Sequence, residues 1–196
     1  ALGQLAAGIA HEIRNPLTSI NILIHSLREK PSDEEYHRED LRVIEEEIHR
    51  INEIVDQFLR FAKPAPPLLQ EADVLSLFEE TLQLLKPQIE KQRISVQKEF
   101  HSLPPTVLDR EQMKQVVLNL TLNALDATSG GGEVIIAVDR SDAAIELAVE
   151  DSGRGMSQEV LERIFEPFFT AKRGSGPPGT GLGLSITHAI VTNHGG

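Results

Sequence analysis

The stretch DREQMKQVVLNLTLNALDAT, residues 109–128, decides the fold of the second half of this chain. Its apolar residues recur with a helical period, and Asp109 stands where an N-cap residue is expected. A helical period also runs over residues 74–92. Residues 94–100 alternate apolar and polar side chains as a strand does, and we expect two further strands, separated by a short polar turn, over residues 132–140 and 143–151. This order predicts an α+β sandwich in which helices cover one face of a single sheet.

The first part of the chain has a different sequence pattern, which is helical throughout. Apolar residues recur every three or four positions from Leu2 to Leu27. A second stripe from Leu41 to Ala62 alternates steps of three and four, which is a heptad pattern. Two helices cannot enclose a core with both stripes, so we predict a hairpin over residues 1–63 that forms a four-helix bundle as a homodimer.

A proline-rich stretch, KPAPPLL at residues 63–69, separates the helical part of the chain from the part with mixed helices and strands. Its prolines end the second helix and stiffen the connection into an extended segment. We therefore predict a linker over residues 64–70 and a second domain over residues 71–196.

Charge and cysteine content limit the classes of function. The chain has 30 acidic and 19 basic side chains, which give a formal net charge of −11. This charge argues against nucleic-acid binding, because a protein that binds phosphates normally presents a basic surface to them. The absence of cysteine excludes disulfides, thiolate catalysis and cysteine zinc sites. No apolar run approaches the ~20 residues of a membrane span. We expect soluble domains in a cytoplasmic location, with no membrane contact in this segment.

The stretch GIAHEIRNPLTSI, residues 8–20, places a histidine and a glutamate side by side in the first helix. His11 lies about 200° around the helix from the isoleucines two positions away on each side, so we expect its imidazole to face solvent. Asn15 shares the face of His11, while Pro16 cannot donate to the carbonyl of Glu12 and should bend or loosen the helix there. The alternative is an ordinary solvated surface histidine.

Two motifs of the second half carry groups suited to a nucleotide and a cation. Asn119 and Asn123 in NLTLNALDA lie four apart on one helix face, where two amide oxygens could converge on a hard cation. DSGRGM, which follows a predicted strand, places Asp151 before two glycines in a turn that lets the backbone approach a flat ligand. Each signal alone is weak, since both asparagines could be ordinary surface amides.

A third motif, GTGLGLSI at residues 179–186, is a glycine-rich loop that opens an apolar helix. Its backbone amides and the helix N-terminus form a candidate anion site. IFEPFFTAK at residues 164–172 stands between this loop and DSGRGM. The order of the motifs, rather than any single match, supports the interpretation.

This ordered set resembles the two-domain core of bacterial two-component sensor histidine kinases, over nearly the whole chain. HEIRNP is similar to their phosphoacceptor box, and NLTLNALDA, DSGRGM, IFEPFF and GTGLGL are similar to the N, G1, F and G2 boxes of their ATP-binding domain. The insert TAKRGSGPP resembles the nitrogen-regulatory branch. The resemblance implies a helical hairpin forming a dimeric four-helix bundle, followed by an α/β sandwich ATP-binding domain of the gyrase, chaperone and histidine-kinase type.

The resemblance also implies an activity and its chemical groups. ATP, with Mg²⁺, would phosphorylate His11, and the phosphoryl group would pass to an aspartate of a response-regulator receiver domain. Glu12 would accept or hold the proton of the imidazole. Asn15 would take part in removing phosphate from the receiver domain. Asn123, helped by Asn119, would coordinate Mg²⁺.

Further residues would bind the nucleotide if the resemblance holds. Asp151 would accept a hydrogen bond from the adenine amino group, and Lys172 would reach a phosphate. Glycines would give the base room or shape the lid over the triphosphate, and these are Gly153, Gly155, Gly179, Gly181 and Gly183. Phe165 and Phe168 are either apolar anchors of that lid or ordinary core residues.

Other functions stay open from the sequence. Gyrase-type ATPases share the ATP fold but carry a glutamate where this chain has Asn119, which favours transfer over hydrolysis. A non-catalytic relay module is a second alternative, and an anti-sigma serine kinase is a third that would lack the hairpin. The chain begins at Ala1 in mid-helix and stops at VTNHGG, whereas relatives continue through further strands, so we expect a segment of a longer protein.

Overall fold

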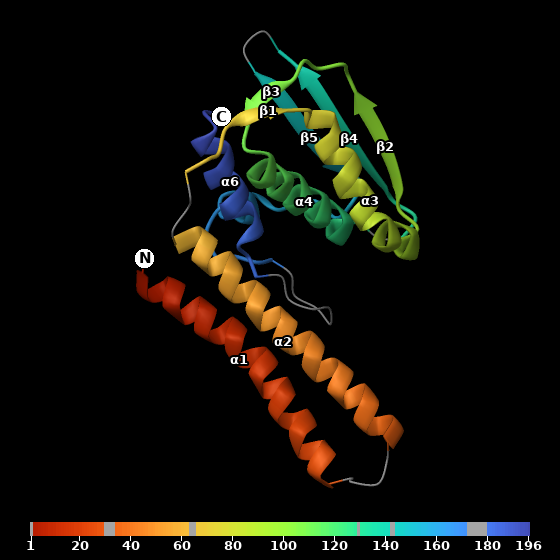
Figure 1. The fold of residues 1–196 in the computed structure, drawn as a ribbon, viewed down its shortest axis with the longest axis vertical. Coiled ribbons are helices and arrows are strands. Elements are labelled where there is room, and N and C mark those ends of the chain that lie inside the picture. The colour runs from red at the N-terminus through yellow and green to blue at the C-terminus, as the bar shows by residue number, and fades with distance from the viewer. Residues whose placement is uncertain (1, 30–33, 63–65, 129, 142–143, 172–179) are drawn as a thin grey trace. The chain divides into compact units, whose positions relative to one another are not determined.

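The computed structural model describes residues 2–29, 34–62, 66–128, 130–141, 144–171 and 180–196 (Figure 1). The chain divides into two compact units. The first contains Ala1–Ala65 with Glu166–Leu182, and the second contains Pro66–Phe165 with Gly183–Gly196.

The hairpin of the first unit consists of helices α1 (Leu2–Glu29) and α2 (Glu34–Ala62), which pack against each other (Figure 1). Ile54 of α2 is buried, at 2% relative exposure. Helix α1 continues through the buried Pro16 without a break in its helical assignment. The predicted helical hairpin is therefore confirmed.

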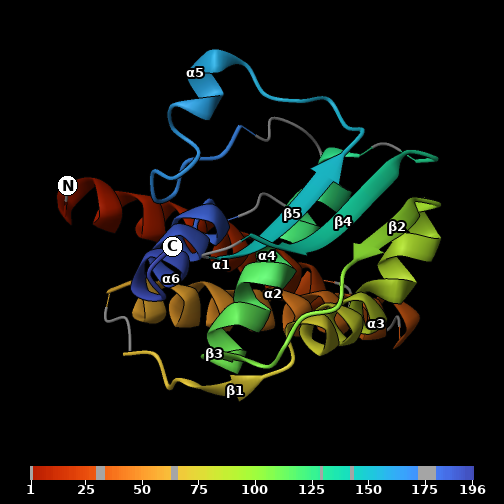
Figure 2. The same ribbon diagram turned by 90° about the horizontal axis from the view of Figure 1, so that it is seen from above.

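The second unit is a three-stranded sheet with helices along one face (Figure 2). The strand order is β2-β4-β5, with β2 parallel to β4 and β4 antiparallel to β5. The predicted α+β sandwich is confirmed, with strands shorter by one or two residues at their N-terminal ends. The main elements are α3 (Val74–Gln92), β2 (Ser95–Phe100), α4 (Arg110–Ala127), β4 (Glu133–Arg140), β5 (Ile145–Asp151) and α6 (Gly183–Asn193).

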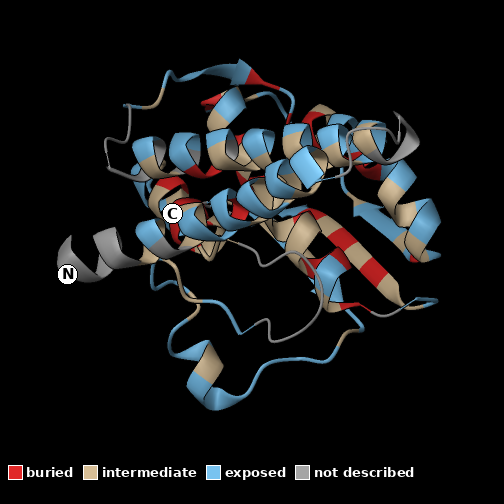
Figure 3. Ribbon diagram, turned by 90° about the horizontal axis from the view of Figure 1, so that it is seen from below, coloured by how far each residue is buried: buried red, intermediate tan, exposed pale blue. Residues whose placement is uncertain are grey.

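The core lies between the sheet and the helices, and strand β4 supplies its regular pattern. Val134, Ile136 and Val138 are fully buried on one face of β4, while the residues between them are half-buried (Figure 3). From the helices, Phe78 of α3 and Leu125 of α4 are also buried, and the ring centroid of Phe78 lies 5.7 Å from that of Phe100 on β2. The alternation has the two-residue period of a strand that covers a core on one side.

Three short elements complete the second unit. Strands β1 (Gln70–Ala72) and β3 (Thr106–Leu108) form a separate antiparallel pair. Helix α5 (Gln158–Leu161) is a single turn. Among the described residues, no helix is long and apolar enough to cross a membrane.

Candidate active site

The candidate site follows one face of α4. Asn119, Asn123 and Ala127 stand at intervals of four residues on this face, which spans about 12 Å along the helix. At one end, Asn119 contacts the first residue of α6, Gly183. At the other end, a β-carbon added to Gly153 would lie 2.5 Å from the carbonyl oxygen of Ala127. Asn123 therefore lies between the start of α6 and the loop after β5.

The local sequence fixes where α4 begins. The side chain of Asp109, the N-cap residue, accepts a hydrogen bond from the backbone N–H of Gln112 at 3.0 Å and one from Leu68 at 2.8 Å. Burial acts to raise the pKa of Asp109, but the backbone hydrogen bonds that its carboxylate accepts outweigh burial, so the pKa lies below its ordinary value. The cap is thus a buried carboxylate satisfied by backbone donors.

The two asparagines of α4 differ in their environments. The amide of Asn119 donates to the carbonyl oxygen of Gly183 at 3.0 Å and to Oγ1 of Thr187 at 3.3 Å. Its Oδ1 accepts from Nε2 of Gln115 at 3.1 Å. Asn123 is half-buried and makes no side-chain hydrogen bond within the part of the chain that the structure describes. The oxygen of Asn123 is accordingly available to a ligand.

Amide and phosphate oxygens, rather than a carboxylate cage, would have to hold a cation here. No cluster of three or more His, Cys, Asp or Glu side chains that could bind a metal occurs among the described residues. An oxygen from Asn123 suits Mg²⁺, which is usually bound by few protein ligands together with water and substrate phosphates. The residues present therefore fit a magnesium ion that arrives with a nucleotide.

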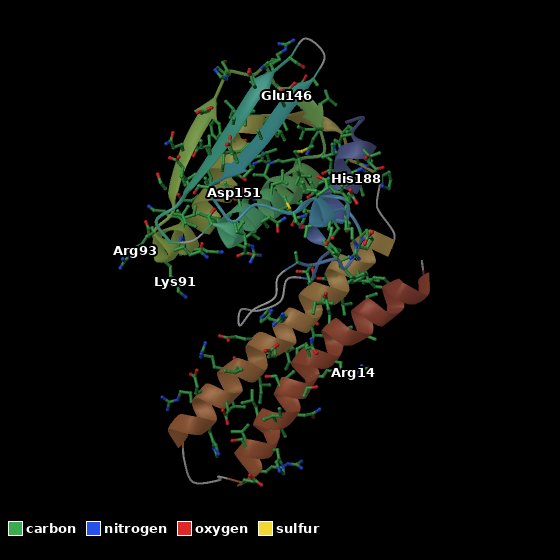
Figure 4. All side chains as sticks on the ribbon, turned by 180° about the vertical axis from the view of Figure 1, so that it is seen from behind. Arg14, Lys91, Arg93, Glu146, Asp151 and His188 are labelled. Atoms are coloured by element: carbon green, nitrogen blue, oxygen red, sulfur yellow. The ribbon has the colours of Figure 1, made fainter. Side chains whose placement is uncertain are left out.

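Asp151 closes strand β5 and shapes the loop after it (Figure 4). Its Oδ1 accepts a hydrogen bond from the backbone N–H of Gly153 at 2.9 Å, and the side chain is exposed. Only glycine fits at position 153, because a β-carbon would collide with the carbonyl of Ala127. Gly155 has a φ of +64°, which favours glycine, and open space around it. The second carboxylate oxygen of Asp151 is not used by the N–H of Gly153, and the expected role of Asp151 in binding adenine stays a prediction.

The glycine-rich loop is described from Thr180 onward. Gly181 has a φ of +63°, and a β-carbon there would lie 2.6 Å from the backbone carbonyl carbon of Phe168. The two residues are also joined by a hydrogen bond of 3.0 Å from the N–H of Phe168 to the carbonyl of Gly181. Lys172 and Gly179, which the sequence marks as phosphate and lid residues, lie outside the described residues.

The two phenylalanines have different surroundings. Phe168 has a φ of +63°, a strained value for a residue with a side chain, and its ring lies close to Gly8 of α1. Phe165 is about half exposed, and its ring centroid lies 4.9 Å from that of His188 on α6. Phe165 is thus an apolar contact to α6 rather than a core residue.

In the hairpin, the sequence-predicted residues occupy one stretch of α1. His11 is helical, but its side chain lies outside the described residues, so its exposure stays a prediction. Burial raises the pKa of Glu12 to about 7, against the opposing effect of the positive charge of Arg50 on α2. Asn15 is exposed. Arg14, before it, is exposed as well (Figure 4). Glu12 therefore has the proton affinity of a base that works near neutral pH.

Family models match both halves of the chain. Residues 1–67 match the His Kinase A (phospho-acceptor) domain, and residues 108–196 match the family described as histidine kinase-, DNA gyrase B-, and HSP90-like ATPase. The catalytic domain of histidine kinase ThkA is a solved structure with 33% sequence identity and a TM-score of 0.58, and the match covers 64% of this chain and 80% of that one. The chain belongs to the sensor histidine kinases.

Longer members of this family align with the entire chain. Signal transduction histidine-protein kinase AtoS of Escherichia coli K12 is 39% identical over 197 residues, which are 100% of this chain and 32% of AtoS. Sensor histidine kinase ZraS of the same strain is 39% identical over 198 residues, which are 42% of ZraS. The chain thus spans about a third to two fifths of these curated kinases.

A second ThkA structure covers more of the kinase core. It is the histidine kinase ThkA in complex with response regulator protein TrrA, with 32% identity and a TM-score of 0.74. The match covers 86% of this chain and 51% of that one.

Sequence reasoning missed several residues of this histidine kinase. Gln115 and Thr187 contact Asn119, and no motif indicates either of them. His194 accepts a hydrogen bond from the N–H of Asp109 at 3.0 Å, a contact that no motif of the sequence indicates. The contacts of Thr187 and His194 join residues that are far apart in the chain, so no local signal could have found them. Gln115 stands four residues before Asn119, so a helix-face analysis could have found it.

Proposed function

We propose that this chain is the kinase core of a two-component sensor, which transfers the γ-phosphoryl group of ATP to His11 and then to a receiver-domain aspartate. The observation that carries the proposal is the free amide of Asn123, located between the Asp151 turn and the start of α6, in a chain whose first helix bears His11. The domain limits of 1–63, 64–70 and 71–196 are part of the same proposal.

At the nucleotide end, each described group has a role that its surroundings support. Asp151 accepts the adenine amino group through Oδ2, because Oδ1 is already used by the N–H of Gly153. The first turn of α6 offers backbone N–H groups and a helix N-terminus to the phosphates. Mg²⁺, held by Oδ1 of Asn123, supplies neutralisation of phosphate charge when bound.

At the hairpin, the neutral imidazole of His11 is the nucleophile. A bond forms between a ring nitrogen and the γ-phosphorus while the bond from that phosphorus to the oxygen of the leaving ADP breaks. The proton on the other ring nitrogen passes to the carboxylate of Glu12. The pKa of Glu12, about 7, makes this carboxylate a stronger proton acceptor than an ordinary glutamate.

The hairpin offers a surface for a second copy of the chain. Leu17 and Ile24 of α1 are exposed seven residues apart, and Leu41, Ile48 and Val55 of α2 repeat at the same interval. Exposed apolar residues with this period are typical of a helix-bundle seam. We infer a homodimer through the hairpin, with a response-regulator receiver domain as the second partner.

Labelled ATP tests the transfer. The chain is incubated with γ-labelled ATP and Mg²⁺ beside the variants His11→Ala and Asn123→Ala, and the label is tested in acid and alkali. We expect an acid-labile, alkali-stable label that both variants lose. Label that survives in His11→Ala would disprove the assigned nucleophile, and the absence of nucleotide binding would disprove the assigned site.

Asn15 is proposed to act in dephosphorylation of the receiver domain. Asn15 is exposed and stands four residues after His11, on the same helix face, where its amide can orient a water molecule. Asn15→Ala should lose receiver phosphatase activity and keep labelling of His11. Full phosphatase activity in a folded variant would show that this role is wrong.

A further inference from the structure

The contacts of Asn119 distinguish it from Asn123, although both face the same side of α4. Its Nδ2 donates to the carbonyl oxygen of Gly183 at 3.0 Å and to Oγ1 of Thr187 at 3.3 Å. Gly183 and Thr187 are one helical turn apart in α6, and Thr187 is buried. Both hydrogens of the amide therefore hold the first turn of α6.

The orientation of this amide is itself fixed. Nε2 of Gln115, one turn earlier in α4, donates to Oδ1 of Asn119 at 3.1 Å. This bond keeps the oxygen directed along α4 and the nitrogen directed toward α6. An amide turned the other way would place its oxygen against the carbonyl of Gly183 and lose that bond.

The packing around Gly183 leaves room for this arrangement. A β-carbon at Gly183 would lie 3.6 Å from Cγ of Asn119, which is ordinary van der Waals contact. Leu182, immediately before α6, is fully buried. Asn119 thus acts at the point where the glycine-rich loop ends and α6 begins.

We propose that Asn119 is a positioning residue that binds the first turn of α6 to α4, and that it is not a magnesium ligand. By fixing this turn, it sets the direction of the backbone N–H groups that receive the nucleotide phosphates. The inference deepens the proposed function and depends on this site being the ATP site. Asn123, which has no side-chain hydrogen bond among the described residues, is then the asparagine that ligates the cation.

The substitution Asn119→Asp separates the two roles. A magnesium ligand would tolerate it, because a carboxylate oxygen binds this hard cation at least as well as an amide oxygen. A clamp, which here means a residue that holds α6 through the hydrogen bonds it donates, would not tolerate it. The new oxygen cannot donate and would face the carbonyl of Gly183. We therefore expect Asn119→Asp to be worse than Asn119→Ala.

The experiment measures binding of a fluorescent ADP analogue to the full chain, once with Mg²⁺ and once with EDTA. Asn119→Ala and Thr187→Val should weaken binding about three- to tenfold in both conditions, which is the loss expected for about one hydrogen bond. Asn123→Ala should weaken only the Mg²⁺-dependent part. Thr192→Val, an exposed threonine of the same helix, is the matched control and should bind as the wild type does.

Two further readouts keep the test decisive. The double variant Asn119→Ala/Thr187→Val should bind like Asn119→Ala alone, because the Thr187 contact requires Asn119. Hydrogen exchange should be faster across residues 183–187 in Asn119→Ala, even without nucleotide. Tight Mg²⁺-dependent binding by Asn119→Asp, or a loss confined to assays with Mg²⁺, would overturn the proposal.

The two proposals fail in different ways. If the wild type binds no nucleotide, the proposed ATP site is wrong, and hydrogen exchange at residues 183–187 still measures the clamp. If the wild type binds and Asn119→Ala leaves both exchange and EDTA binding unchanged, the clamp is wrong while the ATP site stands.

Discussion

At the scale of single residues, Glu12 joins the chemistry of the site to the stability of the hairpin. Burial raises its pKa to about 7 from 4.5, and the positive charge of Arg50 reduces that rise. The folded hairpin therefore holds a proton that the unfolded chain releases between these two values. Because the side chain is only half-buried, solvent screening keeps the effect modest.

This proton gives the first prediction, a pH dependence with a defined sign. Between pH 4.5 and 7, Glu12 binds more protons in the folded state than in the unfolded state. The free energy of unfolding therefore falls as pH rises through this range. Glu12→Gln should remove that decline and leave the variant more stable than the wild type at pH 8. Thermal melting at pH 5 and pH 8 measures it, and parallel curves for both proteins would contradict it.

Gly181 of the glycine-rich loop and Gly183, the first residue of α6, give a second residue-scale prediction. Gly181 has a left-handed φ, and a β-carbon there would meet the backbone of Phe168 at 2.6 Å. Gly181→Ala should cost at least 1–2 kcal/mol by the left-handed penalty alone. Gly183→Ala adds only ordinary contact and should be nearly neutral for folding.

Hydrogen exchange at the N–H of Phe168, which bonds the carbonyl of Gly181, reports this difference directly. Exchange should accelerate in Gly181→Ala and stay unchanged in Gly183→Ala. Equal exchange in the two variants would show that the loop does not require glycine at position 181.

At the scale of elements, Asp109 decides where α4 starts, and with it where both asparagines lie. The carboxylate is buried and accepts two backbone N–H groups, from Gln112 and Leu68. Asp109→Ala should lower the free energy of unfolding by about 1–3 kcal/mol, through loss of the cap and of buried hydrogen bonds. Asp109→Asn, which keeps one acceptor, should lose less.

The lowered pKa of Asp109 gives this prediction its control. The ionised carboxylate of Asp109 stabilises the folded state fully at pH values above 3.8, the ordinary pKa of an aspartate. This stabilisation is lost as pH falls through the lower pKa of the folded state. Urea unfolding at pH 7 should therefore separate wild type from Asp109→Asn, and the difference should shrink at pH 3. A difference that persists at pH 3 would mean that the carboxylate charge is not the cause.

The same elements show what the sequence could and could not predict. Helices α3 and α4 begin after Asp73 and Asp109, whose side chains cap them, so local signals were sufficient. The β1–β3 pair was missed because each strand has three residues and its partner is distant in the chain. The contacts of Asn119 could not be predicted for the same reason, since its partners on α6 stand 64 and 68 residues later.

At the scale of the whole molecule, the described residues of the hairpin include both buried and exposed apolar side chains. Ile54 is buried, whereas Ile48, at 47% relative exposure, and Val55 lie on the exposed stripe of α2. Covering an exposed Val, Leu or Ile side chain stabilises an assembly by roughly 1.5–3 kcal/mol when burial is complete. Several such residues at heptad spacing are enough to drive association.

The last prediction follows from this stripe. Ile48→Glu places a charge in the proposed seam and should convert the dimer into a monomer, whereas Glu45→Gln, on an exposed position of the same helix, should not. Sedimentation velocity measures the state of each variant. The nucleotide site lies on α4 and α6, so the monomeric variant should bind the ADP analogue like the wild type. A wild-type chain that sediments as a monomer at all concentrations tested would contradict the homodimer, and loss of nucleotide binding in Ile48→Glu would show that the ATP site depends on the hairpin.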